Sequence, residues 1–518
     1  MKIGIFLNYA PGVKLTTEGL GRYLGTLMKG FQEAGNEIVI ACPKWLLPSM
    51  QDLEKDLKIP GKELQWITTD TIPPVWKVYQ LVTRKKKPAR KKKRWEALYR
   101  RHMLLMAECD SWPGLLAEGI VLAFFSVAGG AVMAVGKMAN GLFRLTKRGF
   151  KKIAGRIDKK KKAEISRSMF QRMQERSAET LVDRINHYKP VDLWYVPALF
   201  WPEVNQITNG QVVVNAPDLV TQEFPVGFAK LVDEKQTEDC RRTIEEGKYF
   251  ITYCDYIGSE LIQKQYGGRE KQFYSVLHSN HDLLPLIQIP QDVSKQMNLG
   301  KEKDLTLEFS KSVLAGIRVK SDVVNGHQLA NTRYLFYATQ FRPNKNLMTL
   351  LEAFRILIQR KFQHLRLILT CNPDVSEELR NYLDRYDLWG DVVFCVGVSS
   401  QELAALYRCA ELSVTTTLYE GGFPFTFGEG MSVGTPSIMS DIPQIREVLE
   451  PAGLDAAMFR ATDTDDLVQK ILWALENRDK LYQMELPLYE KLAKRTDKVV
   501  AEEYMQVFDS ILHQEGIK

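Results

Sequence analysis

The chain has 518 residues, of which 45% are hydrophobic and 26% are charged. This composition is that of an ordinary globular protein, which excludes a fibrous or disordered chain, and the length suffices for two or three domains with a large core. The seven cysteines, an odd number without a CxxC pair, favour free thiols in a reducing compartment over a disulfide framework. The opening run MKIGIFLNYA lacks the long apolar segment and cleavage site of a signal peptide, so none is expected.

The net charge of +7 is distributed unevenly along the chain. Residues 84–101 contain eleven Lys or Arg and one acidic residue, and residues 137–162 have the same count, so each segment carries +10. The rest of the chain therefore carries −13, since 7 minus 20 is −13. The basic character belongs to one region and not to the whole protein.

Predicted strands and helices alternate over most of the chain. Residues 2–9 predict a strand, residues 19–35 a helix that ends at Gly35, and residues 37–43 a second strand. Further strands are expected at 191–197, 211–218, 249–255, 272–280, 333–339, 365–371, 392–397, 412–417 and 436–441, with helices at 347–361 and from residue 400. This alternation predicts an α/β fold with parallel, doubly wound sheets.

The pattern divides into two α/β units. We expect an N-terminal domain over residues 1–290, a linker between about 285 and 331, and a C-terminal domain over 330–495. A final helix in residues 496–518 follows them.

Residues 81–185 interrupt the first unit with basic and apolar sequence. Residues 119–136 form a run of eighteen uncharged residues, at the low end of the length that spans a membrane. Basic clusters flank this run on both sides and favour the same anionic leaflet, so an in-plane or re-entrant helical element is preferred to a span. We expect residues 84–162 to bind an anionic membrane surface. The alternatives are a helix buried between domains, with solvated charges outside it, and a nucleic-acid role, for which no aromatic-basic motif is present.

Two glycine- or cation-bearing turns precede helices. Gly12, Gly19 and Gly21 lie between the first strand and the first helix, where backbone N–H groups and the helix dipole favour a phosphate or a sugar, although such glycines also simply allow turns. Arg342 and Lys345 precede the helix at 347, and two cations there suit a diphosphate. The alternative for this second pair is ordinary surface charge.

The segment LYEGGFPFTFGEGMSVGTP, residues 418–436, combines carboxylates with glycines. Gly421 and Gly422 let backbone amides approach a ligand closely, and Glu420 and Glu429 can accept paired hydrogen bonds from vicinal hydroxyls of a hexose or a ribose. The sequence from Glu429 predicts a helix, a stop at Gly434 and a strand, with Glu429 near the helix start.

These three pieces, in this order, resemble the retaining GT-B glycosyltransferases of the GT4 type, also called glycosyltransferase group 1. GLGRY is similar to their GGxxRY-like loop, FRPNKN to their R-x-x-K clamp, and EGGFPFTFGEGMSVGTPSIMSD to their E-x7-E and GxPV motifs. The resemblance covers about 1–60 and 190–480 and implies two facing Rossmann-like domains with a cleft, plus a C-terminal helix that crosses back to the N-terminal domain.

The resemblance also implies roles for individual residues. Arg342 and Lys345 would neutralise the donor pyrophosphate, and Glu429 would hold the ribose. Glu420, with the amides near Gly421 and Gly422, would hold the donor sugar. Gly12 and the turn at Gly19 and Gly21 would close on the donor phosphate and the acceptor. No metal and no resident cofactor are expected, because GT-B enzymes stabilise the leaving diphosphate with cationic side chains and helix N-termini.

Two positions depart from the family pattern. Eight residues separate Glu420 from Glu429, where the family has seven, which requires either a bulge or a displaced Glu420. Pro217 and Asp218 stand where many relatives have a His-Asp pair. The aspartate of this pair is retained as Asp218. The resemblance implies that Asp218 and Glu420 are the candidate catalytic residues.

Two further motifs favour structural roles over metal binding. HSNH at residues 278–281 has no evident third ligand, and we interpret it as a loop that closes the N-terminal domain. TDTDD at residues 462–466 is similar to a DxD motif, but Thr and Asp there predict a cap for the following helix.

The resemblance implies a retaining hexosyltransferase that uses a UDP- or GDP-hexose and acts in polysaccharide biosynthesis. The basic insertion predicts peripheral or monotopic association with the cytoplasmic face of the membrane. We therefore expect the acceptor to be a lipid-linked or membrane-proximal glycan. The alternatives are a nucleotide-sugar epimerase and a non-catalytic pseudo-transferase that scaffolds or activates another enzyme at the membrane. No nucleic-acid partner is expected.

Overall fold

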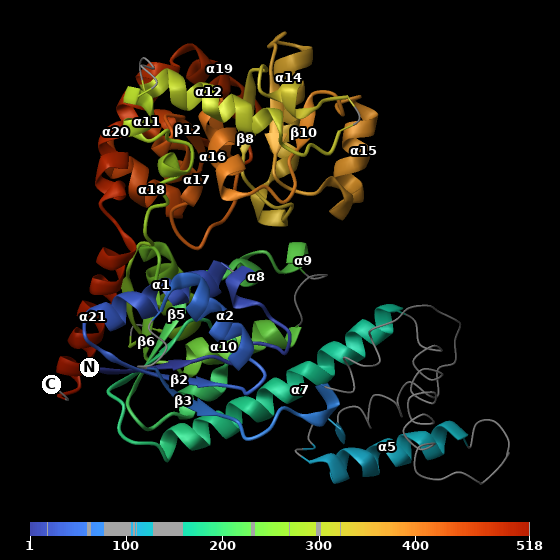
Figure 1. The fold of residues 1–518 in the computed structure, drawn as a ribbon, viewed down its shortest axis with the longest axis vertical. Coiled ribbons are helices and arrows are strands. Elements are labelled where there is room, and N and C mark those ends of the chain that lie inside the picture. The colour runs from blue at the N-terminus through green and yellow to red at the C-terminus, as the bar shows by residue number, and fades with distance from the viewer. Residues whose placement is uncertain are drawn as a thin grey trace. The chain divides into compact units, whose positions relative to one another are not determined.

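The computed structural model describes residues 1–17, 19–59, 64–76, 105–106, 109, 111–127, 159–228, 234–268, 270–296, 302–321 and 323–516 (Figure 1). By its internal contacts the chain divides into two units, residues 1–214 with 508–518, and residues 215–507. Its strands form a seven-stranded and a six-stranded sheet whose paired strands run parallel, which confirms the predicted α/β class.

The seven-stranded sheet has the order β3-β2-β1-β4-β5-β6-β7. Its strands are β1 (Lys2–Phe6), β2 (Glu37–Cys42), β3 (Leu64–Thr68), β4 (Leu193–Val196), β5 (Gln211–Ala216), β6 (Tyr249–Thr252) and β7 (Gln272–Ser275). The accompanying α-helices are α1 (Gly19–Glu33), α2 (Leu47–Leu57), α5 (Trp112–Val127), α7 (Lys159–Asn186), α8 (Val220–Glu223), α9 (Pro225–Phe228) and α10 (Glu234–Glu246), and η4 (Ile257–Gly267) is π-helical. The central strands are almost wholly buried and apolar, as expected for a parallel sheet covered on both faces.

Helix α7 shows that the predicted insertion, residues 81–185, extends too far toward the C-terminus. Met169, Leu181 and Ile185 of this helix are buried in the first unit. The Asn8 and Gln174 side chains also exchange hydrogen bonds with each other's backbone carbonyl, at 2.8 and 2.7 Å. From Met169 onward α7 is therefore part of the core, where it contacts β2 and β3.

The rest of the insertion is described only in part. Most of residues 84–162, including the segments that predicted membrane binding, lie outside the described residues. Helix α5 covers the start of the apolar run, and its Trp112 and Leu116 are about half exposed, at 50% and 51%. Among the helices that the structure describes, none has the length and apolar character needed to cross a bilayer.

The last helix, α21 (Asp497–Gln514), brings its C-terminal part to the first unit (Figure 1). The Phe508 ring lies 5.7 Å from that of Phe31 on α1 and 6.1 Å from that of Tyr195 on β4. Phe508 is fully buried. Aromatic packing therefore anchors the chain's end in the core that the first residues build.

The six-stranded sheet has the order β10-β9-β8-β11-β12-β13. Its strands are β8 (Tyr334–Tyr337), β9 (Arg366–Leu369), β10 (Val392–Phe394), β11 (Leu412–Thr415), β12 (Ser437–Asp441) and β13 (Met458–Arg460). The α-helices of this part are α11 (Gln291–Gln296), α12 (Glu302–Ala315), α13 (Gly326–Leu329), α14 (Leu347–Gln359), α15 (Glu377–Arg385), α16 (Ser400–Arg408), α17 (Phe425–Ser432), α18 (Pro443–Leu449), α19 (Thr464–Glu476) and α20 (Arg478–Ala493). The short helices are η1 (Leu15–Thr17), η3 (Pro202–Gln206), η5 (Leu284–Leu286), η6 (Pro343–Lys345), η7 (Pro373–Val375), η8 (Glu450–Ala452) and η9 (Asp455–Ala457).

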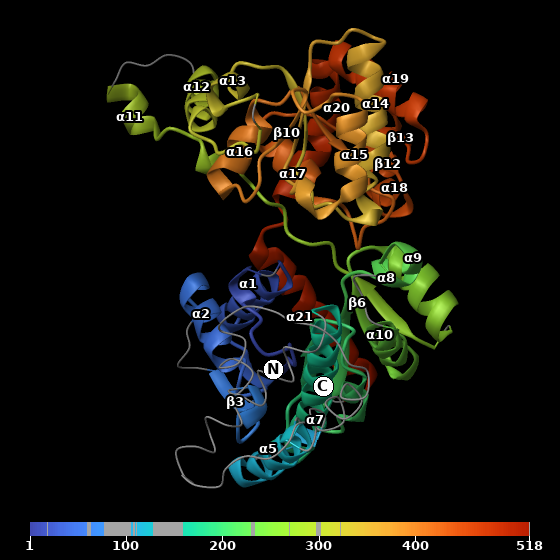
Figure 2. The same ribbon diagram turned by 90° about the vertical axis from the view of Figure 1, so that its right-hand side faces the viewer.

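Alternate residues of the strands fill two separate cores. Leu335 and Tyr337 of β8 face the core that α14, α15, α18 and α19 cover, whereas Tyr334 and Phe336 face the core beneath α12, α13 and α16. Figure 2 shows these two groups of helices on opposite sides of the sheet.

The described parts of the region from 285 to 331, which was predicted as a linker, contribute residues to the second core. Ile287, Leu314, Ile317 and Leu329 are buried there. The linker prediction is wrong for these residues, because their apolar side chains pack on α16 and on the sheet.

Candidate functional site

The turn that carries Arg342 and Lys345 follows strand β8. Arg342 is exposed and extended, and it leads into η6, whose first residue is Pro343. Asn346 then takes a positive φ of 51° to begin α14. The fixed proline φ and the left-handed asparagine turn the chain sharply between strand and helix, which places both cations at the C-terminal edge of a parallel sheet.

Asn344 joins this turn to the segment around Glu420. Its side-chain amide donates to the backbone carbonyl of Tyr419 at 2.9 Å. Its backbone carbonyl accepts from Leu418 N at 2.7 Å and from Thr417 Oγ1 at 3.0 Å. All of these groups are largely or fully buried. The cationic turn and the glutamate segment therefore form one rigid unit.

Lys345 and Glu420 lie side by side. The Nζ atom is 2.5 Å from Oε1, and the two side chains are 21% and 18% exposed. The extra residue before Glu429 thus leaves Glu420 beside the cationic turn.

Asp218 joins this charged group within the second unit. The surrounding protein raises the pKa of the Asp218 carboxyl by desolvation, the Glu420 charge raises it further, and Arg342 and Lys345 lower it. Water still reaches Asp218, which limits the effect of desolvation. Asp218 also packs beside Gly421, where a Cβ atom would lie 2.9 Å from the Asp218 Cβ, so Asp218 lies next to Glu420 and its partner Lys345.

Gly421 and Gly422 allow close approach of protein backbone. A Cβ atom on Gly421 would lie 1.8 Å from the carbonyl oxygen of Pro217, and one on Gly422 would lie 2.7 Å from Cβ of Tyr253. Tyr419 adds a contact in the same place, since its hydroxyl accepts from Leu219 N at 2.8 Å. The sequence predicted close approach of these glycines to a ligand, and the structure adds a packing reason for them.

Glu429 is the fifth residue of α17, because this helix starts at Phe425 and not near Glu429 as predicted. Its Oε2 atom accepts a hydrogen bond from the Tyr407 hydroxyl at 3.0 Å, and its Oε1 atom lies 3.4 Å from Nδ1 of His281. Burial, and next the Glu429 charge, raise the pKa of Tyr407 well above its usual value, so the phenol keeps its proton and remains a donor. Tyr407 and His281 were not predicted, and the only signal for His281 was the HSNH motif.

The predicted glycines of the first unit surround the start of α1. Gly12 has φ of +92° and packs on the Trp76 ring, and Gly19 is the first residue of α1 with open space where a Cβ would stand. A Cβ on Gly21 would lie 2.4 Å from the carbonyl oxygen of Leu15. A positive φ explains Gly12, and tight packing explains Gly21.

The two motifs considered for metals have structural contacts. Within the part of the chain that the structure describes, no group of three or more His, Cys, Asp or Glu could hold a metal ion. The Asp463 side chain accepts from Asp466 N at 2.9 Å and caps α19, which confirms the helix cap predicted for TDTDD. The seven cysteines are all free, as predicted.

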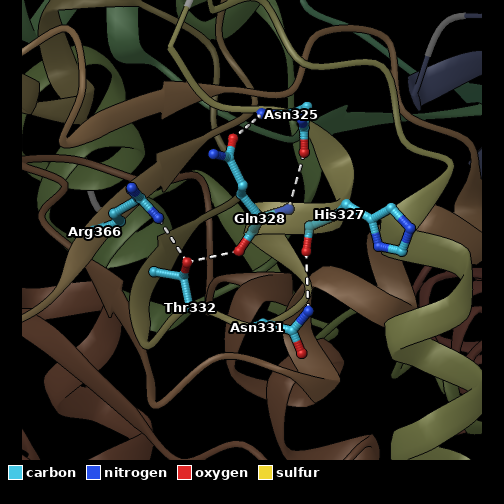
Figure 3. A pocket seen from close by; sticks show the side chains of 6 residues that line it. All are labelled: Asn325, His327, Gln328, Asn331, Thr332 and Arg366. Atoms are coloured by element: carbon cyan, nitrogen blue, oxygen red, sulfur yellow. Dashed lines mark hydrogen bonds between the residues drawn. The ribbon is translucent and has the colours of Figure 1, made fainter.

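A polar pocket lies beside α13, and none of the charged residues Arg342, Lys345 and Glu420 lines it (Figure 3). Its side chains are largely occupied with local structure: Asn325 and Gln328 form a capping box, and Arg366 donates to Thr332 at 2.6 Å. Asn331 donates to the carbonyl of His327 at 3.1 Å. This pocket lacks the paired carboxylates and cations that surround Lys345.

Comparison with known proteins identifies a relationship for part of the chain. Residues 324–498 match the family described as Glycosyl transferases group 1. O-antigen chain mannosyltransferase B of Escherichia coli is 30% identical over 157 residues, which cover 30% of this chain and 40% of that protein. O-antigen chain mannosyltransferase RfbU of Salmonella typhimurium is 28% identical over 201 residues, covering 38% of this chain and 52% of that protein. The chain therefore spans about half or less of the length of these relatives.

Solved structures are similar over nearly the whole chain. HepE of Anabaena in complex with UDP and glucose has a TM-score of 0.53 at 13% identity, covering 98% of this chain and 100% of that one. Sucrose-phosphate synthase of Thermosynechococcus elongatus has a TM-score of 0.54 at 14% identity, covering 99% of each. At this level of identity the likeness concerns the fold.

Proposed function

From the membership of residues 324–498 in the glycosyl transferases group 1 family, and from the GT-B fold of the chain, we propose that the whole protein is a retaining glycosyltransferase. It transfers a hexose from a nucleotide diphosphate sugar to a glycan acceptor. The observation that carries the proposal is the meeting of Arg342 and Lys345 with Glu420 and Asp218 at one location.

This arrangement suits the chemistry of glycosyl transfer. As the bond between the sugar and the diphosphate breaks, negative charge grows on the departing phosphate. Arg342 and Lys345 supply preorganised positive charge for it without a metal. Glu420 and Glu429 accept hydrogen bonds from hydroxyl groups of the sugar and the ribose. Attack of the acceptor on the face that the leaving group departs from then retains the anomeric configuration.

The proposed class of donor is supported by relatives in sequence and by a protein of similar structure. The curated relatives are named as mannosyltransferases, and HepE was solved with UDP and with UDP-glucose. A GDP- or UDP-hexose is therefore the donor class that we propose. The cationic turn recognises the diphosphate that both donors share.

The acceptor that we propose is a lipid-linked or membrane-proximal glycan at the cytoplasmic membrane face. Two segments of +10 each, 84–101 and 137–162, provide electrostatic attraction to anionic lipid, worth about 1 kcal/mol for each cation near the surface. Trp112 and Leu116 of α5 add exposed apolar side chains between these segments. The two relatives named as O-antigen chain mannosyltransferases support the glycan part of this proposal.

The donor assignment is tested by thermal unfolding of the full chain with UDP-glucose, GDP-mannose and ADP-glucose. A ligand at 100 times its dissociation constant stabilises a protein by about 2.7 kcal/mol. We expect a clear rise in melting temperature with UDP-glucose or GDP-mannose. If none of the three changes it, the donor site is refuted and a non-catalytic pseudo-transferase becomes the better description.

A further inference from the structure

The loop that contains HSNH, residues 278–281, lies along helix α17 from end to end. The Nε2 atom of His278 is 2.5 Å from the carbonyl oxygen of Phe423, just before the helix. At the other end, Leu283 N donates to Ser432 Oγ at 3.1 Å. Between these points, a Cβ on Gly428 would lie 1.9 Å from Asn280 Oδ1, so only glycine lets the loop approach the helix this closely.

The two histidines of the loop enclose one aromatic ring. The Phe425 ring stacks on His278 with 3.7 Å between centroids and an interplanar angle of 25°, and on His281 with 4.4 Å and 16°. Phe425 is the first residue of α17, the helix that carries Glu429. The stack therefore fixes the loop against the start of the helix.

His278 is firmly held in this stack. Both of its ring nitrogens face carbonyl oxygens, those of Ser279 at 3.0 Å and Phe423 at 2.5 Å, so both hydrogen bonds form together only when both nitrogens carry a proton. Burial lowers the pKa of His278, and the two carbonyls oppose this effect. His278 thus belongs to the supporting structure.

His281 differs because its side chain is 54% exposed while its Nδ1 atom reaches Glu429. Glu429 is only 13% exposed, and the Tyr407 hydroxyl engages its other oxygen. His281 and Tyr407 thus approach the carboxylate from two different elements and restrict its rotation.

We propose that His281 is a positioning residue for the donor site. Its ring, stacked on Phe425, places Nδ1 where it holds the Glu429 carboxylate in the orientation that accepts the hydroxyl groups of the donor ribose. This inference rests on the proposed function, in which Glu429 binds the ribose. It adds a residue from outside the family motif to the site.

Two variants of the full chain separate the stack from the hydrogen bond. His281→Phe keeps a ring on Phe425 but removes the N–H, whereas His281→Asn removes the ring but keeps an amide donor close to the position of Nδ1. His327→Ala is the control, since His327 is a histidine of the separate pocket in Figure 3, where its backbone carbonyl makes the hydrogen bond. Calorimetric titration with UDP and GDP measures binding, and donor turnover gives KM and kcat.

We expect His281→Phe to raise the dissociation constant and the donor KM about fivefold, the size of a single hydrogen-bond effect, with kcat and the melting temperature unchanged. His281→Asn and His327→Ala should bind within about twofold of the wild type. Wild-type nucleotide binding by His281→Phe would overturn the inference. It would also be overturned if both His281 variants lost nucleotide affinity equally and also had a lower kcat and a lower melting temperature. If the wild type itself binds neither nucleotide, the proposed function fails instead.

Discussion

The ammonium group of Lys345 lies 2.5 Å from the carboxylate of Glu420, so the residue proposed for the diphosphate and the residue proposed for the sugar neutralise each other. Both are about one-fifth exposed, and Asn344 fixes the backbone between them. A bound diphosphate would share Lys345 with Glu420. Each partner then holds the other in place for the ligand, and neither charge is left alone when the site is empty.

Replacement of Lys345 tests its role in diphosphate binding. We expect Lys345→Gln to weaken binding of UDP or GDP by about 10- to 100-fold, because a charge-assisted hydrogen bond is lost. Titration calorimetry on the two proteins measures this. Lys320→Gln is the matched control, since Lys320 is also paired with a carboxylate, that of Asp374, but on the surface. An equal effect of both variants would contradict a specific role for Lys345.

Removal of the Tyr407 hydroxyl tests the orientation of Glu429. In Tyr407→Phe the ring still fills its buried position, but Glu429 Oε2 loses the donor at 3.0 Å. We expect a loss of nucleotide affinity of about fivefold, and a larger loss in Glu429→Gln, because the latter alters the ligand-binding carboxylate itself. If Glu429→Gln binds UDP and GDP as the wild type does, Glu429 does not hold the ribose.

The buried Glu485 predicts a pH dependence of stability. Its side chain is fully buried on α20 and accepts from Ser437 N at 3.1 Å, and burial raises its pKa well above the usual value. The folded state therefore keeps a proton on Glu485 at pH values where the unfolded state has released it. The free energy of unfolding consequently falls as the pH rises above the pKa that Glu485 has in the unfolded state. We expect Glu485→Gln to be more stable than the wild type at pH 8.

Urea unfolding at pH 5, 6, 7 and 8 checks this expectation. The advantage of Glu485→Gln should shrink toward pH 5, where the wild-type carboxyl group is protonated in the folded protein. A difference that stays constant over this range, or grows as the pH falls, would show that the charge of Glu485 is not the cause.

The basic segments predict salt-sensitive binding to membranes. We expect the full chain to sediment with vesicles that contain anionic lipid, and to be released at high ionic strength, because salt screens exposed charges over about 8 Å at 0.15 M. Replacement of the lysines and arginines in 84–94 with glutamine should weaken this binding. Equal binding to neutral vesicles, independent of salt, would contradict an electrostatic contact.

The sequence carried much of the fold because strands and helices alternate with clear apolar runs. It also predicted Arg342, Lys345 and Glu420 as site residues, because cations and acids beside glycine and proline stand out at strand ends, and the structure places Lys345 beside Glu420. It missed the packing of the described helices between residues 302 and 329, which are weakly patterned and are fixed by contact with α16 and the sheet. It also placed the start of α17 too late, since FPFTFG reads as a loop until burial of Phe427 and its neighbours makes it a helix.

The contacts between residues of the candidate site were harder to predict from the sequence than the residues themselves. Tyr407 and His281 contact Glu429 from positions 22 and 148 residues away in the chain, and Asn344 contacts Tyr419, the neighbour of Glu420, from 75 residues away. Local pattern carries no information on such pairs. The HSNH motif drew attention to His281, but only the stack on Phe425 explains its place.

The central claim is that the charged group around Lys345 supports sugar transfer from a nucleotide donor. The most direct measurement is release of UDP or GDP from UDP-glucose or GDP-mannose by the wild type and by the double variant Arg342→Gln, Lys345→Gln, in the presence of a membrane lipid extract. We predict release by the wild type with one of these donors and a rate at least about 100-fold lower for the double variant. Equal release by both proteins, or none from either donor by the wild type, would contradict the claim.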